Sequence, residues 1–253
     1  MGPPIIKIKN LSHRYEDGSY GLRDISLEID EGAFVVIAGA NGSGKTTLLR
    51  HLNGLLTPTA GSVEVDGQTV SSNLARARRL VGMMFQDAAS QIIGDTVGED
   101  VAFGPENLRL DREDVDRRVE QALSRVGLAN FAGRRPHLLS GGEKRRLAIA
   151  AILAMQPSII VFDEPFTSLD YPGTRQILEQ MVELQQTGHT LLVTTHELEK
   201  VLAHADRLMI LHDGRLVRDG VPASVLADAE AFGVRSPISR ESRTGIEGLS
   251  WLN

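Results

Sequence analysis

The stretch Gly39-Ala40-Asn41-Gly42-Ser43-Gly44-Lys45-Thr46-Thr47 decides the fold of this 253-residue chain. It matches the P-loop pattern, in which glycines let backbone N–H groups curl around phosphate oxygens. The helix expected after it adds a favourable dipole. In such a loop Lys45 reaches the β- and γ-phosphates, and the Thr46 hydroxyl binds Mg²⁺. The predicted nucleoside triphosphate site comprises Gly39, Asn41, Gly42, Ser43, Gly44, Lys45, Thr46 and Thr47.

The flanks of this loop have the periodicity that a P-loop requires. Phe34–Ala38 is a short apolar run typical of a buried strand, and Thr46–Leu56 is predicted to be a helix. Two more apolar runs, Ser158–Phe162 and Thr190–Thr194, bracket a helix predicted from Pro172 to Gly188. Strands that alternate with helices predict an α/β fold with a mostly parallel sheet, here a P-loop NTPase core.

The remaining segments differ in character from this core. Strand patterns occur near Ile5–Leu11, Leu27–Ile29 and Val63–Val65, and residues 207–217 read as a hairpin. The middle of the chain instead has helical patterns, at Arg112–Val126 and Glu143–Met155. We therefore predict a discontinuous nucleotide-binding core (1–86 and 157–222), a helical subdomain (87–156) and a C-terminal extension (223–253). Beyond about Ser236 the tail is expected to be poorly ordered, unless Trp251 and Leu252 dock.

Asp163 and Glu164 follow the apolar run that ends at Phe162. A carboxylate at this place holds Mg²⁺ through water in a P-loop site, which is the role predicted for Asp163. Because neighbours on a strand alternate in direction, Glu164 is expected to point elsewhere and to polarise the attacking water. Without a P-loop, the same pair would be read as two solvated acids.

Leu139-Ser140-Gly141-Gly142-Glu143 opens a predicted helix. Ser140 is a good N-cap and Glu143 completes a capping box, so the segment is explained by helix capping alone. The alternative is a second phosphate-binding helix N-terminus, because the two glycines leave backbone N–H groups uncovered. Such a site is useful if two chains pair and each lends this helix to the nucleotide of the other.

The P-loop, Leu139–Glu143 and the Asp163–Glu164 pair, in this order, resemble an ATP-binding-cassette (ABC) ATPase over about 220 residues. The resemblance implies that Gln86 meets Mg²⁺ and the attacking water, that His196 contacts the γ-phosphate, and that Asp170 communicates across a dimer. Tyr15 falls where an aromatic residue stacks on adenine, with packing on the sheet as the alternative. The implied assembly is a head-to-tail dimer around two ATP molecules, closed by Ser140, Gly141, Gly142 and Glu143 of the opposite chain.

The stretch from Phe85 to Leu108 is similar to the energy-coupling-factor (ECF) class, whose ATPases drive uptake of vitamins or of cobalt and nickel ions. Ala102-Phe103-Gly104-Pro105-Glu106-Asn107-Leu108 carries most of this resemblance, and Ala88 departs from it, since many relatives have proline there. The implied partners are integral membrane subunits, namely a coupling protein and a substrate-binding component. Ile92 and Ile93 either line a groove for a partner helix or fill the local core.

Composition sets limits on the other functions. A net charge of −6 argues against nucleic-acid binding, and the lack of cysteine excludes disulfides and fits a reducing cytosol. The longest apolar runs are too short to span a bilayer and no secretory signal is visible, so we expect a cytoplasmic protein held at the membrane by partners. Other ABC transporters, soluble ABC proteins and a non-hydrolysing P-loop protein are the alternatives. The transported substrate, and pairing as a homodimer or a heterodimer, stay open.

Overall fold

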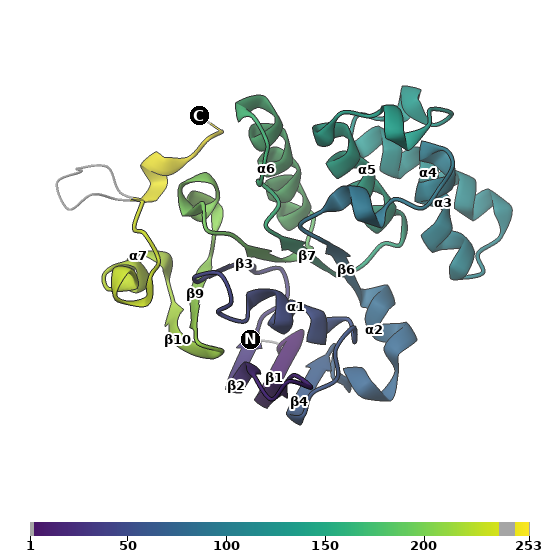
Figure 1. Cartoon of the computed structure of the whole chain (residues 1–253). Helices are drawn as coiled ribbons and strands as arrows, with labels where there is room; N and C mark the ends of the chain where they lie inside the picture. Colours follow the sequence, from purple (N-terminus) through teal and green to yellow (C-terminus); the bar gives the residue numbers. More distant parts are fainter. Residues whose placement is uncertain (1–2, 238–245, 253) are drawn as a thin grey trace.

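The computed structural model describes residues 3–237 and 246–252 (Figure 1). Within these residues, six strands form a central sheet in the order β10-β9-β3-β8-β7-β6. All neighbours are parallel except β9 and β10, which form the predicted antiparallel hairpin. The strands are β3 (Phe34–Ala38), β6 (Val81–Met84), β7 (Ile159–Asp163), β8 (Thr190–Thr194), β9 (Arg207–His212) and β10 (Arg215–Gly220).

The central sheet separates two apolar cores. Along β3, Phe34 and Val36 face one core, whereas Val35 and Ile37 face the other, as side-chain alternation requires. The first core is closed by α6 (Tyr171–Gln186) and by the helical region. Because both faces are covered, every residue of β3, β7 and β8 is buried.

The second core lies between the central sheet and an N-terminal sheet. This second sheet has the strand order β2-β1-β4-β5 and is antiparallel throughout. Helix α1 (Lys45–Leu52) packs in the same core through Leu48, Leu49 and Leu52. The sheet consists of β1 (Ile6–Arg14), β2 (Tyr20–Ile29), β4 (Ala60–Val65) and β5 (Gln68–Thr69). The predicted antiparallel β-subdomain is thus confirmed.

The chain between β6 and β7 is helical and lies to one side of the sheet (Figure 1). Its helices are α3 (Val97–Asn107), α4 (Arg112–Arg125) and α5 (Gly141–Ala154). Elsewhere lie α2 (Leu74–Leu80) and α7 (Pro222–Leu226), and short 3₁₀ turns include Ala88–Gln91, Leu198–Lys200, Leu202–His204 and Ile246–Leu249. The domain boundaries that we assign on this basis stay a prediction.

One sequence expectation, the end of the helix after the P-loop, requires correction. Helix α1 ends at Leu52 and not at Leu56, because Gly54 adopts a left-handed φ of 69°. In addition, Trp251 and Leu252 pack against the first core, so the docked alternative holds for residues 246–252. The expectation of poor order for residues 238–245 lies outside the described residues.

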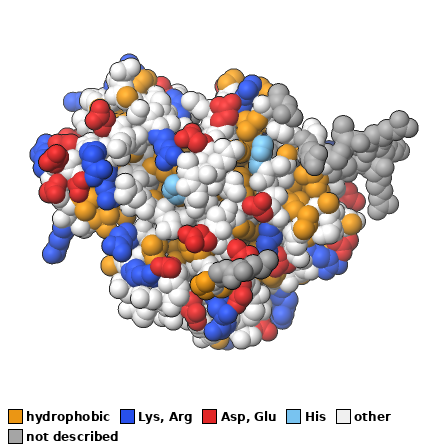
Figure 2. All heavy atoms as spheres, turned by 180° about the vertical axis from the view of Figure 1, so that it is seen from behind, with side chains coloured by type: hydrophobic (Ala, Val, Ile, Leu, Met, Phe, Trp, Pro, Cys, Tyr) orange, Lys and Arg blue, Asp and Glu red, His pale blue; other side chains and the backbone are white. Residues whose placement is uncertain are grey.

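On the face of the molecule shown in Figure 2, basic side chains are interspersed with acidic ones.

Candidate nucleotide site

The carboxyl ends of β3, β6, β7 and β8 meet at one edge of the central sheet, where parallel α/β proteins place their ligand sites. A pocket of about 530 Å³ opens there. The sequence-predicted residues that line it come from five separate segments of the chain. They are Tyr15, Asn41, Gly42, Ser43, Gly44, Lys45, Thr46, Thr47, Gln86, Asp163, Glu164 and His196.

The P-loop backbone requires glycine at two of its turns. Gly39 has a φ of 151°, and a Cβ there would lie 2.3 Å from the carbonyl oxygen of Leu211. Gly44 has a φ of 104°, and a Cβ there would lie 2.5 Å from the carbonyl oxygen of Gly21. Any side chain at either position therefore clashes with backbone, so this loop conformation requires glycine at both.

Lys45 extends along the P-loop into the pocket. Its Nζ donates to the carbonyl oxygens of Gly39 at 2.7 Å and Ala40 at 3.2 Å. Burial lowers the pKa of Lys45 from its usual 10.5, and the carboxylates of Glu164 and Asp163 partly oppose this shift. The ammonium thus lies in a partly dehydrated place, where it attracts a phosphate more strongly than in bulk water.

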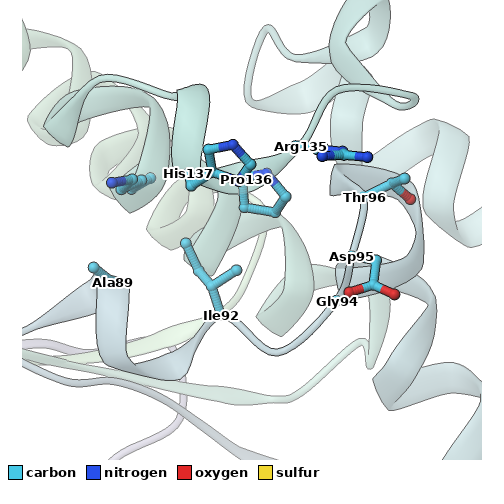
Figure 3. A pocket seen from close by; sticks show the side chains of 9 residues that line it. Ala89, Ile92, Gly94, Asp95, Thr96, Arg135, Pro136 and His137 are labelled. Atoms are coloured by element: carbon cyan, nitrogen blue, oxygen red, sulfur yellow. The ribbon is translucent and has the colours of Figure 1, made fainter.

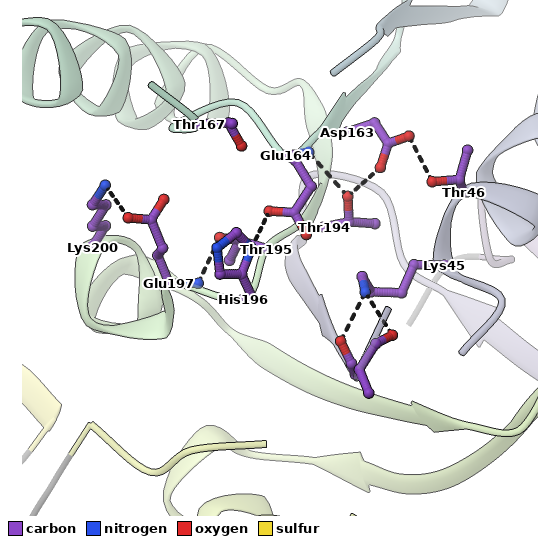
Figure 4. A network of polar contacts seen from close by, with 12 residues as sticks. Lys45, Thr46, Asp163, Glu164, Thr167, Thr194, Thr195, His196, Glu197 and Lys200 are labelled. Atoms are coloured by element: carbon purple, nitrogen blue, oxygen red, sulfur yellow. Dashed lines mark hydrogen bonds and ion pairs between the residues drawn. The ribbon is translucent and has the colours of Figure 1, made fainter. Parts of the chain in front are cut away.

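Asp163 is held at the floor of the pocket by two hydroxyl groups. Thr46 Oγ1 donates to its Oδ2 at 2.8 Å, and Thr194 Oγ1 donates to its Oδ1 at 2.6 Å (Figure 4). A hydroxyl and a carboxylate in contact, next to a phosphate loop, are oxygen donors of the kind that Mg²⁺ takes beside nucleotide phosphates. The donor set therefore fits Mg²⁺, although the described residues contain no cluster of three His, Cys, Asp or Glu ligands.

Glu164 faces the pocket for a reason other than strand alternation. It lies just past the end of β7 with a left-handed φ of 51°, and its N–H donates to the carbonyl and hydroxyl oxygens of Thr194. Its Oε2 accepts from Nδ1 of His196 at 2.9 Å (Figure 4). The carboxylate is buried and the imidazole largely exposed. Asp163 and Glu164 therefore point in different directions because of the left-handed turn at Glu164, and not because of the expected alternation of side chains along a strand.

Tyr15 and Gln86 lie at the rim of the pocket. The hydroxyl of Tyr15 is 2.7 Å from Thr47 Oγ1 and its ring stands edge-on to His13 at 4.7 Å, yet 41% of the residue is exposed. Packing on the sheet alone does not account for this exposure. Gln86 follows β6 and is exposed in the loop that leads to the helical region. Gln91 braces that loop by accepting from the Phe85 N–H at 2.7 Å.

The segment from Ser140 to Glu143 caps α5 as predicted, away from the pocket of its own chain. Both bonds of the capping box are present, since Glu143 N–H donates to Ser140 Oγ and Ser140 N–H donates to Glu143. The Ser140 N–H lowers the pKa of the Glu143 carboxyl. Within the described part of the chain, a Cβ on Gly141 or Gly142 would meet no atom within 4 Å outside the adjacent residues and the backbone of α5. Packing within the chain therefore does not require glycine at these positions.

Asp170 is the N-cap of α6, where its Oδ1 accepts from the Gly173 N–H at 2.9 Å. The predicted role in communication across a dimer stays a prediction.

Thr194 is a residue of the site that the sequence did not lead us to predict. It forms hydrogen bonds with both the Asp163 carboxylate and the Glu164 backbone. Its position at the end of β8 could have predicted this role, because parallel neighbouring strands end at the same edge of the sheet and β8 neighbours β7.

A second pocket, of about 710 Å³, lies beside the Gln86 loop (Figure 3). Ile92 lines it and also packs on the first core, whereas Ile93 is 59% exposed. The alternative in which both isoleucines fill the core is therefore wrong for Ile93. The other lining residues are Ala89, Gly94, Asp95, Thr96, Arg135, Pro136, His137 and Lys144.

Known proteins resemble this chain in sequence and structure. The family described as "ABC transporter" matches residues 22–167. The ECF transporter ATP-binding protein EcfA of Methanocaldococcus jannaschii is 42% identical over 231 residues, which are 90% of this chain and 83% of that protein. CbiO1 from Clostridium perfringens, part of an ABC transporter complex, superposes with a TM-score of 0.82 at 33% identity, covering 91% and 93% of the two chains.

A third comparison concerns an assembled cassette. The dimeric ATP-binding cassette MJ0796, bound to ADP and Pi, superposes with a TM-score of 0.77 at 32% identity, covering 86% of this chain and 98% of that one. This chain belongs to the ABC transporter ATP-binding family. The resemblance to its ECF class is confirmed by the relatives, and the P-loop NTPase fold by the structures. Within residues 3–237 and 246–252, no helix has the length and apolarity of a membrane span.

Proposed function

We propose that this chain is the ATP-hydrolysing subunit that energises an ECF-type ABC importer for a vitamin or for cobalt or nickel ions. The observation that carries this proposal is the convergence of Lys45, Asp163, Glu164 and His196 on one pocket at the edge of the sheet. The similarity to EcfA and CbiO1 supports the class of transporter. The alternative is the ATPase of another ABC transporter class, which shares this site and differs in its partners.

ATP lies along the P-loop in this proposal. The amides from Gly39 to Thr47 and the Lys45 ammonium hold the phosphates, and the half-exposed ring of Tyr15 stacks on adenine. Thr46, Gln86 and Asp163 would hold Mg²⁺, which would neutralise charge on the phosphate oxygens.

Hydrolysis uses the Glu164–His196 pair. The Glu164 carboxylate orients a water and accepts its proton, while the water oxygen attacks the γ-phosphorus in line with the bond to the β–γ bridging oxygen. That bond breaks, leaving ADP and inorganic phosphate. Lys45 and His196 stabilise the charge on the transferred group. The hydrogen bond from His196 keeps the Glu164 carboxylate directed into the pocket.

Two chains close head to tail around two nucleotides. The exposed start of α5 brings Ser140, Gly141 and Gly142 to the γ-phosphate held by the opposite chain, since no side chain of the glycines blocks the approach. Glu143 keeps the Ser140 backbone in place. Asp170 fixes the turn before α6, through which the two sites communicate.

The membrane partner docks beside the Gln86 loop. An apolar helix from an integral membrane coupling protein fits the second pocket, where Ile92 offers apolar surface and Asp95, Arg135 and Lys144 offer charge. The chain then works at the inner face of the cell membrane without entering it. A separate membrane component selects the substrate.

Affinity capture of the chain from detergent-solubilised membranes, followed by identification of co-purifying proteins, tests the proposal. We expect a small integral membrane protein to co-purify in stoichiometric amount and ATPase activity to depend on Lys45. Capture of the subunits of another type of ABC transporter would support the alternative class. An active ATPase that captures no membrane protein would point to a soluble ABC protein.

A further inference from the structure

The C-terminal residues 246–252, here named the C-terminal strap, return to the loops beside the nucleotide site. The strap packs on the first core through Ile246, Trp251 and Leu252. Its Ser250 hydroxyl lies 3.3 Å from Nε2 of His204, in the 3₁₀ turns that follow His196. The C-terminal strap thus lies beside α6 (Figure 1).

Trp251 contacts the start of α6. Its ring centroid lies 5.2 Å from that of Tyr171, with the two planes tilted by 32°. Tyr171 is the first residue of α6 and follows the N-cap Asp170 directly. An aromatic pair at this distance restricts both side chains, so the strap fixes the first turn of α6.

Lys200 joins the strap to the two loops that carry Glu164 and His196. Its Nζ lies 5.5 Å from the ring centroid of Trp251 and 5.8 Å from that of Phe166, which is buried two residues after Glu164. The same ammonium pairs with Glu197, the neighbour of His196 (Figure 4). Glu197 is held in turn, because its N–H donates to Thr195 Oγ1 at 2.9 Å.

Because Lys200 is buried, the position of its ammonium depends on Glu197, Phe166 and Trp251 together. Lys200 is only 8% exposed, and a buried ammonium is costly unless an anion and aromatic faces surround it. Removal of the Trp251 ring exposes one side of the Lys200 ammonium to water. The hydrated ammonium then makes weaker contacts with Glu197 and Phe166. Both loops then gain freedom, and the 2.9 Å contact between His196 and Glu164 is no longer fixed.

We propose that Trp251 and Lys200 are positioning residues for ATP hydrolysis, which fix the Glu164–His196 pair from outside the nucleotide pocket. This inference rests on the proposed function. It assigns no contact with ATP to either residue, because neither lines the pocket. It therefore predicts an effect on turnover and none on nucleotide affinity.

The test compares Trp251→Ala, Trp251→Phe and a control, Val221→Ala, in the full-length chain. Val221 is 65% exposed and lies between β10 and α7. We expect Trp251→Ala to lower kcat about tenfold with KM for ATP unchanged within about twofold, because misplaced groups slow the reaction. Trp251→Phe should recover most of kcat, and Val221→Ala should match the wild type. A normal kcat in Trp251→Ala, a rise in KM alone, or no recovery by Trp251→Phe would overturn the inference.

A second measurement needs no variant, since Trp251 is the only tryptophan of the chain. Its fluorescence should change when a non-hydrolysable ATP analogue binds with Mg²⁺, because the phosphates meet His196, whose neighbour Glu197 pairs with the Lys200 ammonium beside the Trp251 ring. Saturation with the analogue without any change in emission would overturn the coupling. If the wild type hydrolyses ATP and Trp251→Ala does so equally well, this inference alone fails. A wild type without ATPase activity would instead refute the proposed function.

Discussion

Nδ1 of His196 lies 2.9 Å from Oε2 of Glu164, and this contact joins the ends of two neighbouring strands. Since a carboxylate accepts, Nδ1 of the imidazole carries the hydrogen. The backbone of Glu164 is fixed as well, through two bonds from its N–H to Thr194. The carboxylate therefore enters the pocket from a rigid turn, as a group that orients water must.

Replacement of Tyr15 by Ala should weaken nucleotide affinity. Stacking of a base on an aromatic ring contributes about 1–3 kcal/mol, so we expect KM for ATP to rise roughly tenfold while kcat changes little. Tyr15→Phe is the matched control, because it keeps the ring and removes only the bond to Thr47. Titration with a fluorescent ATP analogue gives the affinities. Equal affinity in Tyr15→Ala and the wild type would refute stacking.

Replacement of Gly142 by Val should separate folding from function. Among the described residues, no atom other than those of the adjacent residues and the backbone of α5 lies within 4 Å of a Cβ at this position. The free energy of unfolding should therefore change by less than about 1 kcal/mol. The isopropyl group would nevertheless meet the nucleotide of an opposing chain. We expect ATP-dependent dimerisation and ATPase activity to be lost, measured by analytical ultracentrifugation and phosphate release. Gly133→Val, at another open position, is the control. Normal dimerisation of Gly142→Val would contradict the proposed contact.

His51 should make the fold sensitive to acid. The residue is 1% exposed and its Nδ1 donates to the Thr47 carbonyl oxygen, while burial lowers its pKa from 6.5. Below pH 6.5 the unfolded chain therefore binds a proton that the folded chain resists, and stability is lost as the pH falls.

The substitution His51→Gln removes this titration. Its stability should decline less steeply between pH 6.5 and 5, by up to about 1.4 kcal/mol per pH unit. Urea unfolding at several pH values measures the slope. The lowered pKa values of His189 and His204 leave part of the dependence in place. The same slope in His51→Gln and the wild type would exclude His51 as a source.

The sequence predicted the strands of the core and most of the residues that line the nucleotide pocket. The apolar runs of β3, β7 and β8 are buried on both faces, which makes them easy to recognise, and the P-loop joins one of them to α1. Helix α3 was not predicted as a separate element. It contains Gly98, Gly104 and Pro105, which disrupt a helical pattern, and it is held by the Thr96–Glu99 capping box and by tertiary packing.

Long-range contacts were beyond sequence reasoning. Glu164 adopts a left-handed backbone conformation without being a glycine, so no local sequence signal predicts this turn. The hydrogen bonds of Thr194 depend on the order of the strands in the sheet, which the sequence does not give directly. The cluster of Lys200, Phe166, Tyr171 and Trp251 joins segments from distant parts of the chain. Only tertiary structure brings these side chains together.

The turnover of Glu164→Gln tests whether Glu164 activates the attacking water, with Glu199→Gln as a nearby acidic control outside the pocket. An amide of the same shape binds ATP but accepts no proton. We predict unchanged ATP affinity, a kcat at least about 100-fold below the wild type, and an ATP-bound dimer that persists during size-exclusion chromatography. Hydrolysis by Glu164→Gln at the wild-type rate would remove Glu164 from its proposed role.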